Sequence, residues 1–371
     1  QAEYPESVEY ELLLKLTENL DDDKIVHISG VSYHRHEEKQ AEGKTDPKDL
    51  NGDKQGSEED QNRLREEYNL KQDYLHRNNI RADLVYMTDM QGYRVAYEPT
   101  DDPMISIVIP SKDHPDVLKR CIDSLMDITE YKNYEIIVID NGSSDVNRLI
   151  TENYLQEKKA TYYYHPMDFN FARMCNMGAD LAKGEFLLLL NDDTEILQPD
   201  WLSRMAGQAQ QPKTGAVGAK LLYPDSTKIQ HCGMINTQTD YVHLFMHCDD
   251  TDDLLYGLNH RDFNCASVTG ACLMIKKDLF HSVGGFDEGF PVAYNDTELC
   301  FELCEKGYYN VVRNDVCLYH HESLSRGTDV QDEKKRLRLE GERARLRKKH
   351  PDAYGRDPYL NAEVDRIQPY G

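Results

Sequence analysis

The sequence predicts an α/β fold with a Rossmann-like, mostly parallel central sheet flanked by helices, and three observations carry this prediction. Residues 105–110 (ISIVIP) and 135–140 (EIIVID) are short, unbroken apolar runs, as expected of strands buried on both faces. Between the two runs, apolar side chains recur at helical spacing, at Val117, Leu118, Cys121, Ile122 and Leu125. The alternation then continues, because a strand pattern at 161–164 (TYYY) and a helix pattern at 170–183 precede another apolar run at 185–190 (EFLLLL). Such strand–helix–strand units place their strands in parallel with right-handed crossovers.

The elements after residue 190 are predicted from the same patterns. FNCASVTGACLMIKK (263–277) is expected to form one apolar strand, and GGFDEGF (284–290) a glycine-bearing loop. A helix is expected to begin at Asn295 or Asp296, and VCLYHH (316–321) to end a last apolar strand.

The chain divides by composition into five segments. Residues 37–61 are polar and rich in Gly, Pro, Asp and Lys, which is typical of a linker, and residues 62–103 read as a helix followed by a hairpin around Gln91-Gly92. Residues 104–330 form the α/β domain, and residues 331–371 a basic helix and tail. Residues 1–36 resemble the end of that domain: YELLLKLTE (10–18) matches TELCFELCE (297–305), and Tyr33-His34 falls on Tyr319-His320. Chance similarity is the alternative to a preceding copy of the same domain.

Composition narrows the classes of partner. The 371 residues contain 43 basic and 67 acidic side chains, a net charge of −24, which argues against nucleic acid and anionic membranes as binding partners. No apolar stretch approaches the roughly 20 residues of a membrane span. The nine Cys are expected to be reduced, mostly buried thiols; Cys300 and Cys304, one helical turn apart, are either packed side chains or metal ligands. The basic run 334–349 is either a solvated helix or one that docks on the acidic face of a partner.

The ends of the predicted parallel strands locate the candidate site, because ligands bind beyond the carboxyl ends of such strands. This rule selects residues 110–113, 140–145 and 191–193. Asn191, Asp192 and Asp193 end the fourth strand, where carboxylates suit a hard divalent cation, although Asp and Asn also end strands as ordinary turn residues.

Two further groups have both a chemical and a structural interpretation. Asp296 opens a helix, so it is either a helix cap or a carboxylate that reaches a pocket as a base. His320 and His321 end a strand, where they are metal ligands or simply packed or solvated side chains.

Taken together, the segments resemble the bacterial family 2 glycosyltransferases of the GT-A fold, of the multidomain type that builds surface polysaccharides. The resemblance covers about residues 104–362 and rests on several motifs in the family order, including SIVIPSKDHPDVLKRCIDSL, NYEIIVIDNGSSD, FLLLLNDDTEI, YNDTELCFELCEKGY and LYHHESLSRG.

The resemblance implies roles for individual residues. The donor nucleotide would be bound by residues at three strand ends: Pro110, Ser111, Asp113, Asp140, Asn191 and Asp192. Asp193 and His320 would hold Mn²⁺ or Mg²⁺, with His321 as the other choice of ligand. Asn191 stands where many relatives have Asp, which removes one carboxylate from the cation site. Asp296 would be the catalytic base, although its usual acidic neighbour is here Asn295. Lys220 and His231 either line the donor pocket or are a surface and a packed residue.

The implied function is an inverting, metal-dependent hexosyltransferase. It would move a sugar from a UDP- or dTDP-linked donor to a glycan or lipid-linked glycan acceptor, in the cytoplasm or at the inner face of the membrane through that acceptor. The sequence also allows the chain to form a homo-oligomer. The alternatives are a non-catalytic GT-A-like module and a sugar nucleotidyltransferase. A nucleotidyltransferase requires a glycine-rich loop after the first strand, and the segment there, IPSKDHPD, has no glycine.

Overall fold

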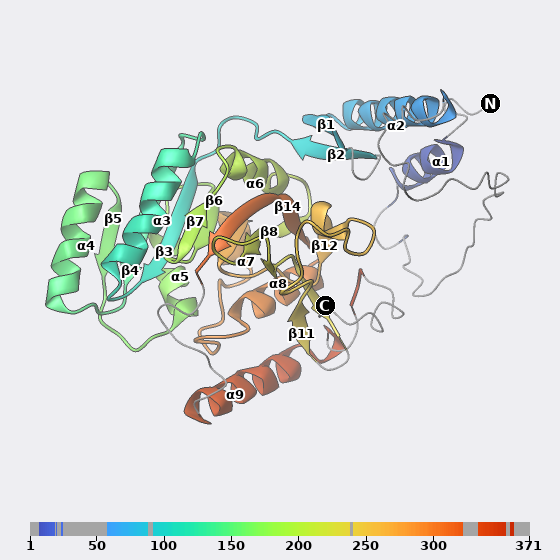
Figure 1. Cartoon of the computed structure of the whole chain (residues 1–371). Helices are drawn as coiled ribbons and strands as arrows, with labels where there is room; N and C mark the ends of the chain where they lie inside the picture. The colour runs from blue at the N-terminus through green and yellow to red at the C-terminus, as the bar shows by residue number, and fades with distance from the viewer. Residues whose placement is uncertain are drawn as a thin grey trace, which may run out of the picture. The chain divides into compact units, whose positions relative to one another are not determined.

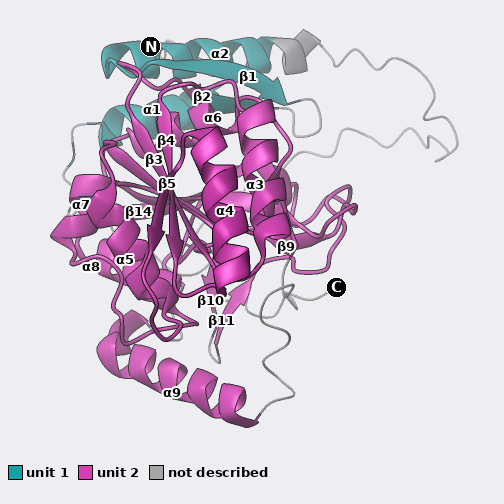
Figure 2. Cartoon of the chain, turned by 90° about the vertical axis from the view of Figure 1, so that its left-hand side faces the viewer, with its two compact units in different colours: residues 1–95, 361–363 teal, residues 96–360, 364–371 magenta. Residues whose placement is uncertain are grey.

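The computed structural model of the chain describes residues 7–18, 20, 24, 58–87, 92–237, 240–321, 333–353 and 357–359. It divides into two compact units, residues 1–95 with 361–363 and residues 96–360 with 364–371 (Figure 2). The predicted match of residues 25–37 to the end of the α/β domain, most of the 37–61 linker and the end of the C-terminal tail lie outside the described residues.

The first unit contains the predicted helix and hairpin. Helices α1 (Val8–Thr17) and α2 (Glu58–Arg77) precede β1 (Ala82–Met87) and β2 (Gly92–Tyr97), which pair as a two-stranded sheet and lead into the second unit. Leu70 and Leu75 of α2 are buried, in agreement with the predicted apolar face. Helix α2 begins four residues before the expected start, within the segment predicted as linker.

The second unit contains one large sheet with helices on both faces (Figure 1). Its elements, in chain order, are β3 (Ile105–Ser111), α3 (Pro115–Ile128), β4 (Tyr134–Asp140), α4 (Asp145–Lys158), β5 (Thr161–Tyr164), α5 (Phe171–Leu181), β6 (Phe186–Leu190), β7 (Thr194–Ile196), α6 (Trp201–Ala209), β8 (Thr214–Leu222), β9 (Ile229–His231), β10 (Met234–Asn236), β11 (Tyr241–His243), η4 (Leu258–His260), β12 (Phe263–Cys265), β13 (Cys272–Lys276), α7 (Lys277–Ser282), α8 (Asn295–Glu305), β14 (Tyr309–His320), α9 (Glu333–Lys349) and η6 (Pro351–Ala353). The strands and helices predicted between residues 105 and 190 are therefore confirmed, as is the helix that begins at Asn295.

The sheet is mostly parallel, as predicted. Its main path runs β5-β4-β3-β6-β13-β8-β14-β12. Strands β5, β4, β3, β6, β8 and β14 point one way, and only β13 and β12 of this path run against them. The carboxyl ends of β3, β4 and β6 therefore meet at one edge, where the sequence places the candidate site.

One predicted strand is wrong. Residues 263–277 form two strands that lie in different parts of the sheet: β12 at its edge beside β14, and β13 between β6 and β8. The chain turns between them, and the Gly270 N–H donates to Asp296 Oδ2 instead of to a neighbouring strand. An apolar run with a single glycine does not reveal this break, because both halves are buried.

Two apolar layers cover the sheet. One packs α3, α4 and α6 against β3, β4 and β6, and the other packs α5, α7 and α8 against the opposite face. All seven residues of β3 are buried, which explains its unbroken apolar sequence. Among the residues that the structure describes, no helix is both long enough and apolar enough to cross a bilayer.

The cysteines are free thiols, and six of the nine are buried, as predicted. Burial raises the pKa of the Cys121 thiol to about 12. Cys300 is fully buried in the apolar layer beneath α8, which supports packing over metal binding for this residue.

Candidate functional site

A pocket of about 230 Å³ opens at the carboxyl ends of β3 and β6. Six residues predicted to bind donor or metal line it: Pro110, Ser111, Asp113, Asn191, Asp192 and Asp193. The Ser111 hydroxyl donates to Asp192 Oδ2 at 2.7 Å, so the two strand ends are joined across the pocket. These residues therefore lie together around one pocket, as the strand order predicts.

Asp113 ties the loop after β3 to the loop after β4. Its carboxylate accepts the Ser144 N–H at 2.7 Å and the Asn147 side-chain amide at 3.1 Å, while its own N–H donates to Ser143. The Ser144 and Asn147 hydrogen bonds hold the pKa of Asp113 below its ordinary value. Its φ of +57° lies in the left-handed region, which a short polar side chain tolerates.

Asp140 stands apart from the other predicted donor-binding residues, since it does not line the pocket. One carboxylate oxygen accepts the N–H groups of Gly142 and Ser143, and the other accepts the Tyr162 hydroxyl at 2.6 Å. Asp140 therefore shapes the loop after β4, and at 2% exposure its carboxylate is enclosed by this loop rather than open to the pocket.

Strand pairing brings Asp193 and His320 together. Strand β7 begins directly after Asp193 and runs antiparallel to β14, with Thr194 opposite His320. The His321 N–H donates to the Asp193 carbonyl oxygen at 2.9 Å, which fixes this register. As a result, His320 Nε2 lies 3.1 Å from Asp193 Oδ1, and both side chains are largely buried. The ring of His321 instead lies 3.0 Å from Glu195, so the geometry favours His320 as the ligand.

The chemistry of this pair fits a divalent cation. A carboxylate oxygen and an imidazole nitrogen about 3 Å apart can both reach one ion at the usual bond lengths of roughly 2 Å. The Asn191 amide nitrogen lies 3.2 Å from the same His320 nitrogen. Asp193 and His320 would thus hold Mn²⁺ or Mg²⁺ beside the pocket.

Asp296 lies in the first turn of α8 and is not among the residues that line the pocket. Its Oδ2 accepts the Gly270 N–H at 2.9 Å and its Oδ1 accepts the Thr297 N–H at 2.7 Å. A side chain added at Gly270 would meet the ring of Phe171, which lines the pocket, and the Cβ of Asp296. Asp296 therefore lies next to the pocket wall, and it caps backbone N–H groups as well.

Helix α9 holds the loop that precedes Asp296. The Glu342 carboxylate accepts the Ala293 N–H at 2.6 Å, and Arg343 donates to the Tyr294 hydroxyl at 3.0 Å. Lys349 pairs with Glu298 of α8, and Leu346 is fully buried among apolar side chains. The basic helix is therefore not simply solvated, because it packs on acidic residues of its own unit, and docking on an acidic partner stays a prediction.

Lys220 and His231 are not pocket residues. Lys220 is buried and pairs with Asp250 at 2.7 Å, away from the residues that line the pocket. His231 is fully buried with its Nδ1 3.0 Å from His243 Nδ1, so the packed interpretation is the correct one. Burial and the neighbouring His243 and His320 hold the pKa of His231 well below its usual value.

Several lining residues escaped the sequence analysis. Lys112 and Asn141 lie within the ranges selected from the strand ends but were given no role, and His114 lies one position outside them. Phe169 lies just before α5 and Phe171 begins it. An aromatic residue at such a position is normally interpreted as part of the hydrophobic core. Gln230, whose side chain contacts His320, belongs to the same segment as His231 and carries no motif signal.

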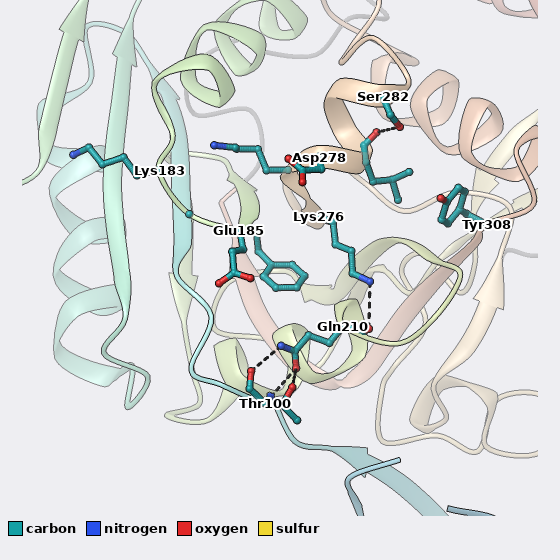
Figure 3. Close-up of a pocket in the computed structure, with 12 residues that line it drawn as sticks. Thr100, Lys183, Glu185, Gln210, Lys276, Asp278, Ser282 and Tyr308 are labelled. Atoms are coloured by element: carbon teal, nitrogen blue, oxygen red, sulfur yellow. Dashed lines mark hydrogen bonds between the residues drawn. The ribbon is translucent and has the colours of Figure 1, made fainter. Parts of the chain in front are cut away.

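A second, larger pocket of about 750 Å³ lies at the opposite end of β6. Figure 3 shows Lys276 directed toward Gln210, which in turn is hydrogen-bonded to Thr100. Glu185, Lys183 and the start of β6 form another wall. None of the predicted site residues lines this pocket, and it lies at the amino end of a parallel strand rather than at its carboxyl end.

Comparison with known proteins identifies the family of the α/β domain. Residues 106–284 match the model of the glycosyl transferase family 2. The chain is 36% identical over 262 residues to the O-antigen biosynthesis protein RfbC of Myxococcus xanthus and 35% identical over 288 residues to the uncharacterized protein y4gI of Sinorhizobium fredii. These alignments cover 70% and 74% of the chain but only 20% and 30% of the respective relatives.

The fold has relatives among solved structures. The structure of GalNAc-T7 with UDP, GalNAc and Mn²⁺ superposes with a TM-score of 0.52 at 13% sequence identity, over 76% of this chain and 59% of that one. The strand order, the family match and these likenesses agree with one another. The second unit therefore contains a glycosyl transferase family 2 domain, with the GT-A fold.

Proposed function

We propose that this domain transfers a sugar from a nucleotide-diphosphate donor to a hydroxyl group of a growing bacterial surface glycan, with inversion at the anomeric carbon. The observation that carries the proposal is the arrangement of the site: Asp193 and His320, the proposed cation ligands, lie 3.1 Å apart, and Asp296 lies next to the pocket wall. UDP- and dTDP-linked sugars are the proposed donors, and the surface-polysaccharide relative supports a glycan or lipid-linked glycan as acceptor.

Each of the proposed site residues has a separate role in the reaction. Asp296 accepts the proton of the acceptor hydroxyl as its oxygen attacks the anomeric carbon from the face opposite the diphosphate. The bond to the diphosphate breaks in the same displacement, so the configuration inverts. A Mn²⁺ or Mg²⁺ ion held by Asp193 and His320 supplies charge neutralisation for the departing diphosphate. Ser111 and Asp113 hold the strand ends that face the nucleotide.

Incubation with a panel of nucleotide sugars, with and without Mn²⁺, tests the proposal. The chain should hydrolyse or transfer at least one donor slowly, and chelation with EDTA should stop the reaction. Binding of glycans without any donor turnover would instead identify a non-catalytic module. Release of pyrophosphate from a sugar phosphate and a nucleoside triphosphate would identify a nucleotidyltransferase.

A further inference from the structure

The buried contact between Gln230 and His320 has no part in the function proposed above. Gln230 lies on β9, which pairs antiparallel with β8. His320 is the last residue of β14. His320 Nδ1 lies 2.6 Å from Gln230 Oε1, and the two residues are only 5% and 9% exposed. A short hydrogen bond in so dry a place is strong, because water cannot replace either partner.

The orientation of the carboxamide follows from its second contact. Gln230 Nε2 donates to the carbonyl oxygen of His320 at 3.4 Å. A flipped amide would set two oxygens against each other there and would present an NH₂ group to the ring. Gln230 Oε1 therefore faces the ring, and the His320 nitrogen opposite it must carry a proton.

The tautomer of His320 decides which nitrogen can accept a cation. With Nδ1 committed as a donor to Gln230, the lone pair of the neutral ring lies on Nε2. Nε2 is the nitrogen that lies 3.1 Å from Asp193 Oδ1. The same hydrogen bond fixes the rotation of the ring about its bond to Cβ, so the lone pair is held toward the carboxylate.

We propose that Gln230 is a positioning residue for the cation site, because it holds His320 as the Nδ1–H tautomer with Nε2 directed at Asp193. This inference rests on the proposed role of His320 in metal binding. Gln230 touches neither the pocket nor the reacting groups, and its effect on catalysis passes entirely through His320.

The test compares three glutamine variants of the full chain. Gln230→Leu keeps the volume but removes the acceptor, Gln230→Glu keeps an oxygen that can accept from Nδ1–H, and Gln198→Leu is the control. Gln198 also binds the backbone of β14, through Asp315 and Cys317, but does not touch the ring of His320.

Two measurements are made, and neither depends on turnover. Mn²⁺ affinity in the presence of UDP is measured by electron paramagnetic resonance, and the tautomer of His320 by ¹⁵N NMR of histidine-labelled protein, assigned with His320→Asn. Gln230→Leu should bind Mn²⁺ about 10- to 100-fold more weakly and lose the Nδ1–H signature. Gln230→Glu and Gln198→Leu should retain the tautomer and bind Mn²⁺ within about threefold of the parent.

The outcomes separate this inference from the proposed function. Parental Mn²⁺ affinity in Gln230→Leu, or an unchanged Nδ1–H signature there, would overturn the role of Gln230 while leaving the metal site in place. A parent chain that binds no Mn²⁺, or one whose binding survives Asp193→Ala, would overturn the proposed metal site and this inference together.

Discussion

Helices α1 and α8 have similar sequences but opposite environments. When YELLLKLTE is aligned with TELCFELCE, Leu12 falls on Leu299 and Leu16 on Leu303. In α8 both leucines are fully buried against the sheet. In α1 the two leucines are 55% and 59% exposed. The same apolar pattern is thus satisfied by packing in one helix and left open in the other.

That residues 1–36 are the end of a preceding copy of the domain stays a prediction. An amphipathic helix is stabilised mainly by the surface its apolar face covers, and no sheet covers this face of α1 among the described residues. The matching position of the proposed base, Asp296, is Glu9 in α1. If this account is correct, substitutions in α8 and its surroundings should have large effects, and the equivalent ones in α1 small effects.

Replacing the proposed base should give the largest effect. Asp296→Asn keeps the size of the side chain and one of the two oxygens that accept backbone N–H groups, but it cannot accept a proton, so turnover should fall about 100- to 10,000-fold. Donor affinity, measured by calorimetry, should stay unchanged because the diphosphate binds at Asp193 and His320. Glu9→Gln is the matched control and should turn over like the parent. Parental turnover in Asp296→Asn would leave Asp296 as a cap only, with Glu298 or Asp287 as the next residue to test.

Replacing either residue of the proposed cation-binding pair should have the second-largest effect. Asp193→Ala and His320→Ala should each weaken Mn²⁺-dependent binding of UDP by about 10-fold or more, since each removes a ligand. His34, which aligns with His320, should be replaceable by Ala without effect on this binding. Unchanged affinity in His320→Ala would transfer the role to His321 or remove it.

Truncating the paired leucines compares the packing of the two helices directly. Leu303→Ala should lower the free energy of unfolding by about 2–5 kcal/mol, because it opens a cavity in a closed apolar layer. Leu16→Ala should change it by less than about 0.5 kcal/mol. Urea denaturation of both variants provides the measurement, and an equal loss in both would mean that α1 is packed in solution.

Loss of the contact between α9 and the loop before Asp296 should have a smaller effect. Glu342→Ala leaves the Ala293 N–H without its carboxylate acceptor, which should cost about 1 kcal/mol of positioning and reduce turnover roughly fivefold. Binding of Mn²⁺ and UDP should not change. Glu340→Ala, on an exposed part of the same helix, is the control. A loss of UDP binding in Glu342→Ala would show that α9 acts on the whole site rather than on the loop before Asp296.

Removal of residues 1–57 should have the smallest effect of all. The segment contains α1 but no residue of the proposed site, so transfer should remain within about twofold of the parent. A folded truncated chain that no longer transfers sugar would assign part of the acceptor site to the N-terminal segment.

The parallel half of the sheet could be predicted from sequence because each of its strands is a separate apolar run. The carboxyl-edge residues followed from the strand order, and Asp193, which meets His320, was among them. The split of 263–277 into β12 and β13 was missed because the turn between them is largely buried, although Ser267, Thr269 and Gly270 lie in it. Gln230 and Glu342 were also missed, because their roles depend on contacts 90 and 49 positions away in the sequence.

The central claim is that the carboxyl-edge pocket is the active site of a metal-dependent, inverting transferase with Asp296 as its base. The most direct test follows the anomeric proton of the donor by ¹H NMR in the parent chain and in Asp296→Asn, with Mn²⁺ and then after addition of EDTA. We expect the parent to release sugar of inverted configuration, to stop on chelation, and to exceed the variant at least about 100-fold. Retained configuration, turnover that persists in EDTA, or equal rates in the two chains would contradict the claim.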